Sequence, residues 1–179
     1  MYIITKSYHA LINIVYLFIL KYLTVSNIFF RFPKIGAGFN IITNSKSTID
    51  LNNLSARNHL CIVVNKGALI FEKNCFVNNG CSFNCLKEIH IGENTLFGEG
   101  VKVYDHDHVI DENYNTSKNE FIKSPVKIGK NCWIGSNTII LKGVNIADNV
   151  VIGANSLVNK SITTSGIYAS KNGSLTRIK

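Results

Sequence analysis

The chain has 179 residues, enough for one domain with its own hydrophobic core, or for one domain with an appendage. Its formal net charge of +8 argues against a cationic partner and favours an anionic one. Nucleic acid, a membrane surface and a phosphorylated small molecule all fit that description, although the lysines are scattered along the chain rather than clustered.

Residues 1–33 form an apolar block of their own. The stretch from Tyr8 to Leu20 is almost entirely apolar, but Lys21 ends it short of the roughly 20 residues that a membrane-spanning helix needs. No small-residue cleavage site follows, so the block does not resemble a secretory signal. We expect a helix that lies on the end of the fold or on a membrane surface, with the basic residues of the block facing anionic headgroups.

A six-residue repeat occupies much of the remaining chain. An aliphatic residue recurs at Ile122, Ile128, Ile134, Ile140, Ile146, Ile152 and Val158. Two earlier sets share this spacing, namely Phe71, Val77 and Phe83, and then Ile91, Phe97 and Val103. The period fits neither a helix nor a long two-residue alternation. It predicts a chain that runs straight, turns a corner and repeats, so that three hexads close one triangular coil.

These coils are predicted to stack through parallel strand pairing and to form a β-helical domain over residues 34–165, followed by a tail at 166–179. The frame also accounts for Cys75, Cys81 and Cys132, which share the fourth position after the aliphatic residue, where a small buried side chain is expected. The five cysteines include no CxxC pair, so no metal site is predicted. An odd number of cysteines without a secretory signal favours reduced thiols in the cytoplasm.

The segment "VYDHDHVIDENYN" interrupts this repeat. If the frame continued through it, Asp107 would point into the apolar interior at a high cost in free energy. We therefore expect the coil to open and residues 105–121 to form an extruded loop. The hexad at Val103 should stack on the one at Phe83, which brings Asn84 one rung from Tyr104 and to the same edge as His106.

The run "VKIGKNCWIGSNTIILKGVNIADNVVIGANSLVNKSI" resembles the C-terminal signature of the hexapeptide-repeat acyltransferases, in particular the galactoside, maltose and polysaccharide O-acetyltransferase group. The likeness extends over roughly residues 69–165. It implies an all-β, left-handed parallel β-helix, a homotrimer with active sites between subunits, and acetyl-CoA as the acetyl donor. Periodicity alone does not give the hand of the coil, because parallel crossovers are usually right-handed.

Acetyl transfer to a hydroxyl needs a base that works near neutral pH, and histidine suits this role. We expect His106 to be that base and Asn84 to position the acceptor or to stabilise charge, and both match polar positions of the family. His108 is the rival base. Asp105 or Asp107 could orient the imidazole, and the sequence leaves this choice open.

The resemblance also implies a groove for acetyl-CoA along the C-terminal coils. The matching positions are Gly135, Ser136, Ala154, Asn159 and Lys160. Trp133 would line the entrance or pack in a core or trimer contact. The tail "ASKNGSLTRIK" departs from the family pattern, since Ser174 stands where a basic residue is common; Arg177 is the substitute candidate for a phosphate contact.

The leading hypothesis is an acetyl-CoA-dependent O-acetyltransferase in the cytoplasm, at or near the inner face of the membrane. Its acceptor would be a saccharide, such as a lipid-linked or surface-polysaccharide precursor, and not nucleic acid. N-acetylation of an amino sugar nucleotide is the closest alternative. A non-enzymatic binding scaffold and a metal lyase of the carbonic anhydrase type are the others, and the lyase would need a third histidine in a suitable frame.

Overall fold

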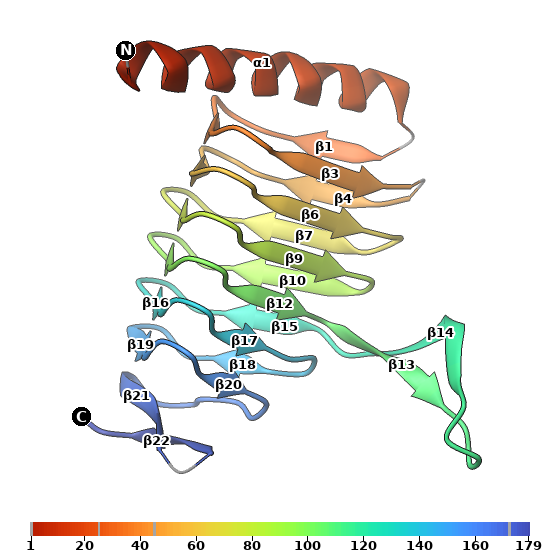
Figure 1. Ribbon diagram of the computed structural model, residues 1–179, viewed down its shortest axis with the longest axis vertical. Helices are drawn as coiled ribbons and strands as arrows, with labels where there is room; N and C mark the ends of the chain where they lie inside the picture. The colour runs from red at the N-terminus through yellow and green to blue at the C-terminus, as the bar shows by residue number, and fades with distance from the viewer. Residues whose placement is uncertain (1, 25, 45, 172) are drawn as a thin grey trace.

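The computed structural model describes residues 2–24, 26–44, 46–171 and 173–179, and for residues 2–6 it describes the backbone alone. The chain winds into a triangular parallel β-helix, with helix α1 (Tyr2–Leu23) lying across its N-terminal end (Figure 1). Each coil contributes one short strand to each of three sheets. The predicted all-β solenoid is confirmed.

Three parallel sheets form the faces of the prism. The first contains β1 (Asn27–Phe29), β4 (Thr48–Asp50), β7 (Ala68–Phe71), β10 (Glu88–Ile91), β15 (Val126–Ile128) and β18 (Asn145–Ile146). The second contains β2 (Lys34–Ile35), β5 (Ser55–Ala56), β8 (Phe76–Val77), β11 (Leu96–Phe97), β16 (Trp133–Ile134), β19 (Val150–Ile152), β21 (Gly166–Lys171) and β22 (Ser174–Arg177). The third contains β3 (Asn40–Thr43), β6 (Cys61–Val64), β9 (Ser82–Cys85), β12 (Lys102–Tyr104), β17 (Ile139–Ile140) and β20 (Leu157–Val158).

The aliphatic positions of the hexads fill the interior, as predicted. Ile134, Ile140, Ile146, Ile152 and Val158 are all buried. In the middle coils the same positions hold aromatic rings, and Phe83 lies between two others. Its ring centroid is 5.0 Å from that of Phe71 and 5.3 Å from that of Phe97, both edge to face. Ile122 is the exception, because it lies outside the solenoid and is exposed.

The fourth hexad position faces inward at the corners. The predicted small buried cysteines Cys75, Cys81 and Cys132 are buried there, and burial raises the pKa of the Cys75 and Cys81 thiols to about 11. Each thiol donates a hydrogen bond to a carbonyl of the next coil, as Cys81 Sγ does to Gly98 O at 3.1 Å. Of the five cysteines only Cys61 is partly exposed, and all five are free.

A ladder of asparagines supports one corner of the prism, a feature that the sequence analysis did not anticipate. Asn74, Asn94, Asn131 and Asn149 all have positive φ, between 53° and 60°. Their carboxamides form a chain along the solenoid axis, in which Asn94 accepts from Asn74 at 3.2 Å and donates to Asn131 at 3.1 Å. Asparagine is the non-glycine residue that best tolerates the left-handed conformation that this turn requires.

Helix α1 covers the first coil, but it is shorter than the predicted block of residues 1–33. It ends at Leu23, and β1 already pairs with β4. Leu17 is fully buried beneath it, and Asn13 Nδ2 donates to the carbonyls of Ile35 and Gly36 at 3.0 and 2.7 Å. Within the described part of the chain, no helix is both long enough and apolar enough to cross a membrane.

Two antiparallel hairpins depart from the regular coil. The predicted loop at 105–121 is the hairpin of β13 (His106–Ile110) and β14 (Thr116–Lys123), which projects from the solenoid (Figure 1). It begins one residue later than expected, because Asp105 remains in the coil. It ends two residues later than expected, at Lys123. The tail predicted at 166–179 is not separate from the β-helix, since β21 pairs with β19 and β22 folds back on β21.

The asparagine ladder yields a test. Asn94→Ala should lower the free energy of unfolding by about 1–2 kcal/mol, because an alanine Cβ is unfavourable at positive φ. It should also lose both carboxamide hydrogen bonds. Asn94→Gly removes the same bonds without the backbone penalty and should be the more stable of the two. Urea unfolding measures the difference, and equal losses for both variants would contradict the role assigned to the backbone.

Candidate active site

The register at the edge where the repeat is interrupted matches the sequence prediction. Strand β12 pairs in parallel with β9, with Val103 opposite Phe83 and Tyr104 opposite Asn84. The half-buried carboxamide of Asn84 donates to Ser82 Oγ at 3.4 Å. Asn84 therefore lies on the third sheet, one rung from the point where the chain leaves the coil to form the hairpin.

Asp105 is the last residue of the coil before the hairpin, and its carboxylate is fully buried. It accepts backbone hydrogen bonds from Leu86 at 2.8 Å, Lys87 at 2.6 Å and Glu88 at 2.8 Å. These three consecutive N–H groups form the corner between β9 and β10, and they replace the water that a buried carboxylate loses. The inward-pointing carboxylate is thus Asp105, not Asp107 as the uninterrupted frame would have required.

The Asp105 carboxylate also contacts His106. His106 Nδ1 lies 2.9 Å from Asp105 Oδ1, and the imidazole is 16% exposed. The rings of Tyr104 and Phe121 stand edge to face with it, at centroid distances of 6.5 and 5.3 Å. Because an ionised carboxylate only accepts hydrogen bonds, this contact favours the tautomer with the proton on Nδ1, in which Nε2 carries the lone pair of the neutral ring.

His108 and Asp107 have different partners. His108 Nδ1 donates to Ser117 O across the hairpin at 2.8 Å, and its ring packs on Phe121. Asp107 is half exposed and forms an ion pair with Lys142, from the turn after β17. Of the two carboxylates that could orient His106, the geometry therefore favours Asp105. Asp107 instead ties the hairpin to the next coil.

The predicted acetyl-CoA positions divide between two edges of the prism. Trp133, Gly135, Ser136 and Ala154 lie on or after strands of the second sheet. Trp133 is 55% exposed on the outer surface, opposite Leu96 and Val151 in the ladder.

Gly135 and Ser136 contact neighbouring coils. A Cβ on Gly135 would come within 2.5 Å of the Ala154 nitrogen, so glycine is required there by the close approach of two coils. Ser136 Oγ accepts a hydrogen bond from the Glu99 N–H at 3.2 Å.

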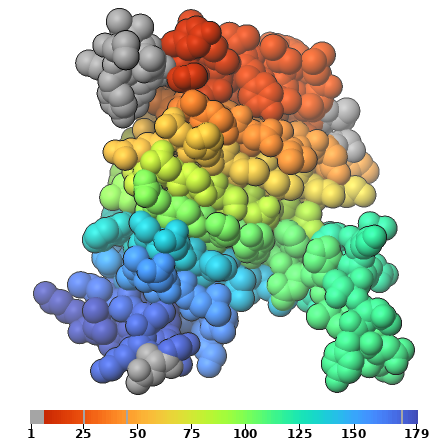
Figure 2. Space-filling model, in the orientation of Figure 1, coloured from red at the N-terminus to blue at the C-terminus, as the bar shows by residue number. Residues whose placement is uncertain are grey.

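Asn159 and Lys160 belong to the other edge, after β20 of the third sheet. Because Val103, Ile140 and Val158 are aligned across β12, β17 and β20, these residues lie two rungs below the start of the hairpin, about 10 Å along the axis. Figure 2 shows an open gap between the projecting hairpin and these C-terminal coils. His106, Asn159 and Lys160 thus share an edge.

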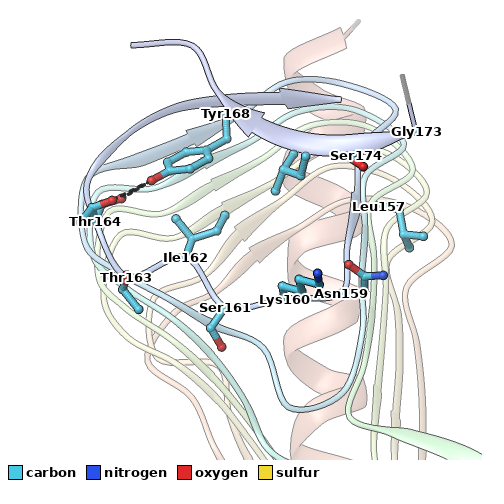
Figure 3. A pocket seen from close by; sticks show the side chains of 11 residues that line it. Leu157, Asn159, Lys160, Ser161, Ile162, Thr163, Thr164, Tyr168, Gly173 and Ser174 are labelled. Atoms are coloured by element: carbon cyan, nitrogen blue, oxygen red, sulfur yellow. Dashed lines mark hydrogen bonds between the residues drawn. The ribbon is translucent and has the colours of Figure 1, made fainter. Parts of the chain in front are cut away.

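Asn159 and Lys160 also line a pocket of about 400 Å³ at the C-terminal end of the solenoid (Figure 3). Tyr168 from β21 lines the same pocket, and its hydroxyl points toward Thr164, with which it hydrogen-bonds. Ser174, at the position where the resemblance implied a basic residue, also lines the pocket. Sequence reasoning missed Tyr168 and Thr164, because they follow the last clear hexad. Arg177 is exposed on β22, where its Nε donates to Lys179 O at 3.1 Å.

Comparisons with known proteins give consistent results. A family model described as the hexapeptide repeat of succinyl-transferase matches residues 125–160. A Dictyostelium discoideum protein assigned by inference as an acetyltransferase is 38% identical over 67 residues, which is 37% of this chain and 35% of that protein. This chain therefore matches about a third of the length of the curated relative.

Two solved structures share the fold over most of the chain. The maltose O-acetyltransferase of Clostridium difficile 630 is 28% identical, with a TM-score of 0.57 over 89% of this chain and 72% of that one. A hexapeptide-repeat acetyltransferase of Vibrio cholerae O1 biovar eltor, solved with acetyl-CoA, is 20% identical, with a TM-score of 0.56 over the same shares. The left-handed parallel β-helix expected from the resemblance is confirmed.

The buried carboxylate gives a stability prediction. Asp105→Ala leaves three backbone N–H groups without an acceptor and should cost about 3 kcal/mol or more in the free energy of unfolding. The matched change Asp107→Ala removes an exposed carboxylate and should cost less than about 1 kcal/mol. Urea titration of both variants checks this. Equal midpoints would mean that the corner at 86–88 does not depend on Asp105.

Proposed function

We propose that this chain, a hexapeptide-repeat protein with the left-handed β-helix fold, is an acetyl-CoA-dependent O-acetyltransferase that modifies a hydroxyl of a saccharide. The observation that carries the proposal is the Asp105–His106 pair at the mouth of the hairpin. It presents a partly exposed imidazole in the tautomer that a general base needs. The likeness to an O-acetyltransferase at 28% identity supports the reaction class.

In the proposed reaction, His106 Nε2 accepts the proton of the acceptor hydroxyl as its oxygen attacks the thioester carbonyl carbon. A new C–O ester bond forms and the C–S bond breaks. The proton then passes from the imidazole to the departing sulfur, so that coenzyme A leaves as a thiol and the histidine returns to its starting state. Asp105 touches no reacting atom, and it acts by holding the ring in place through Nδ1.

Asn84 is assigned a second polar role on the same edge. Its register with Tyr104 places it on the rung before the hairpin, within the same surface as the histidine. A carboxamide there can hold an acceptor hydroxyl or donate to developing negative charge. His108 is the weaker candidate for the base, because it lies further along the hairpin and its Nδ1 donates to a backbone carbonyl rather than to a carboxylate.

The division of the acetyl-CoA positions supports a homotrimer with active sites between subunits. Trp133 lies on one face of the prism, whereas His106 and Lys160 lie at a different edge. In a homotrimer, the Trp133 face of one copy would lie beside the His106 edge of its neighbour, so that both sets contact one acetyl-CoA molecule. The neighbour's edge would enter the open gap beside the hairpin (Figure 2).

The acceptor is proposed to be a precursor of a surface polysaccharide, such as capsule, O-antigen or exopolysaccharide, and a lipid-linked form would suit the apolar N-terminal helix. Acceptor contacts should come from the hairpin, since it is the polar insertion next to the base. Amino sugar nucleotides would use the same histidine with an amine as the nucleophile.

Replacement of the base is the direct test. His106→Ala should lower the rate of acetyl-CoA-dependent thiol release with a saccharide acceptor by about 10² or more, because a positioned general base contributes that much. His108→Ala, on the same hairpin, is the control and should keep the rate within about threefold of the wild type. The assignment of the base fails if the two variants behave alike or in reverse order.

The bond formed distinguishes the two acyl transfers. Mild alkali should release acetate from the product, since esters cleave under these conditions and amides persist. Products are assayed by mass spectrometry before and after treatment. An acetyl group stable to alkali would identify the chain as an N-acetyltransferase while leaving the role of His106 intact.

Binding of the donor can be tested without an acceptor. Acetyl-CoA at about 100 times its Kd should raise the Tm, because such an excess stabilises the folded state by about 2.7 kcal/mol. Lys160→Ala should reduce this shift if the ammonium meets a CoA phosphate, whereas Lys73→Ala, far from this edge, should not. No shift for the wild type would favour a non-enzymatic scaffold.

A further inference from the structure

The outer face of helix α1 is apolar and exposed. Its inner side packs on the first coil through Leu17, but the opposite side presents large apolar side chains to solvent. They are Tyr8, Leu11, Ile12, Val15, Phe18, Ile19, Tyr22 and Leu23, which are between 43% and 79% exposed. The spacing of three and four residues places them along one stripe of the helix. Burying so much apolar surface would be favourable, so a contiguous exposed patch of this size marks an interaction site.

The position of the helix makes this stripe accessible to a flat surface. In Figure 1, α1 lies across the end of the solenoid with the coils on one side only. Figure 2 shows the N-terminal segment forming that end of the molecule, away from the hairpin and the C-terminal coils. The first coil adds two exposed aromatic residues, Phe29 and Phe32. A planar partner could thus contact the helix without touching the candidate active site.

The charge of this end is uniformly positive. The first acidic residue of the chain is Asp50, and the preceding 49 residues contain five lysines and arginines, so five of the eight units of formal net charge arise there. Lys21, Arg31, Lys34 and Lys46 are exposed. Among the ion pairs between described residues, none involves these four. No carboxylate in these ion pairs offsets their positive charges, so the charges can attract a negatively charged partner.

We propose that the outer face of α1, together with the basic residues of the first coil, binds an anionic lipid bilayer surface. An apolar stripe on a helix that lies flat, with cations around it, is the combination that inserts into the headgroup boundary of a membrane. Each nearby lysine or arginine adds attraction to anionic lipids. The inference rests on the N-terminal end alone and does not require the proposed acetyl transfer.

A second copy of the chain fits this end less well. Two α1 faces packed against each other would bring two ends of the same positive charge together, and the described residues of the helix and first coil supply no carboxylate to offset them. An anionic bilayer meets both requirements at once, because it buries the stripe and neutralises the cations.

Vesicle sedimentation with the full chain tests the proposal. The protein should bind vesicles with about one third phosphatidylglycerol at least tenfold more tightly than vesicles of phosphatidylcholine alone, and high salt should reduce this preference. Leu11→Gln with Val15→Gln should weaken binding to both vesicle types by about tenfold or more, since glutamine keeps the helix but removes apolar surface. Arg31→Gln with Lys34→Gln should weaken binding to the anionic vesicles only.

Ile178→Gln is the matched control, because Ile178 is as exposed as Leu11 but lies in the C-terminal tail. It should bind like the wild type, and all variants should retain the wild-type Tm. Equal binding of the wild type to neutral and anionic vesicles, or unchanged binding of the Leu11/Val15 variant, would overturn the proposal. So would an absence of vesicle binding, including the case where the wild type instead self-associates through α1. None of these readouts depends on acetyl transfer.

Discussion

Each coil of this protein must place its backbone N–H and C=O groups opposite those of the next coil, at the spacing of paired parallel strands. This constraint determines the rest of the structure. It fixes which residue of one coil lies above which residue of the next, so the identity of a side chain at one rung limits its neighbours at the adjacent rungs. The asparagine ladder, the glycine at 135 and the inward thiols all follow from that repetition. The candidate base lies where the repetition is interrupted.

Asp105 shows how the interruption is accommodated. A carboxylate inside the prism would be very unfavourable without partners, but the corner at 86–88 supplies three N–H groups directed at it. The following residue is thereby held at the surface with one nitrogen engaged and the other free. The carboxylate thus serves two purposes, because it stabilises the exit of the hairpin and also orients the histidine. A mutation there affects stability and the proposed catalysis together, and the two effects are separated only when both are measured.

Much of this arrangement follows from the sequence. The period of six gives the triangular coil, and counting hexads back from Val103 gives the pairing of Tyr104 with Asn84. The hand of the coil came from resemblance, because a repeat length carries no information about chirality. Asp105 was one of two carboxylates that the sequence offered to orient the histidine. Its burial was not predictable, since a frame based on apolar positions says nothing about three backbone N–H groups at a corner. The same limit explains why the loop was placed one residue early. The tail was missed as part of the second sheet because β21 has no aliphatic hexad pattern.

The first coil of any parallel solenoid has strand edges with unpaired N–H and C=O groups that a second molecule could pair with, and such edges promote filament growth. Here side chains of α1 bind three carbonyls at that end. Asn13 donates to the carbonyls of residues 35 and 36, and the Tyr16 hydroxyl donates to Ile41 O at 3.3 Å. The helix therefore works as a terminator of the stack, and its inner face protects the molecule from polymerising end to end. A chain without the helix would expose the unpaired strand edges of its first coil. It should aggregate in a concentration-dependent way while its coils are still folded.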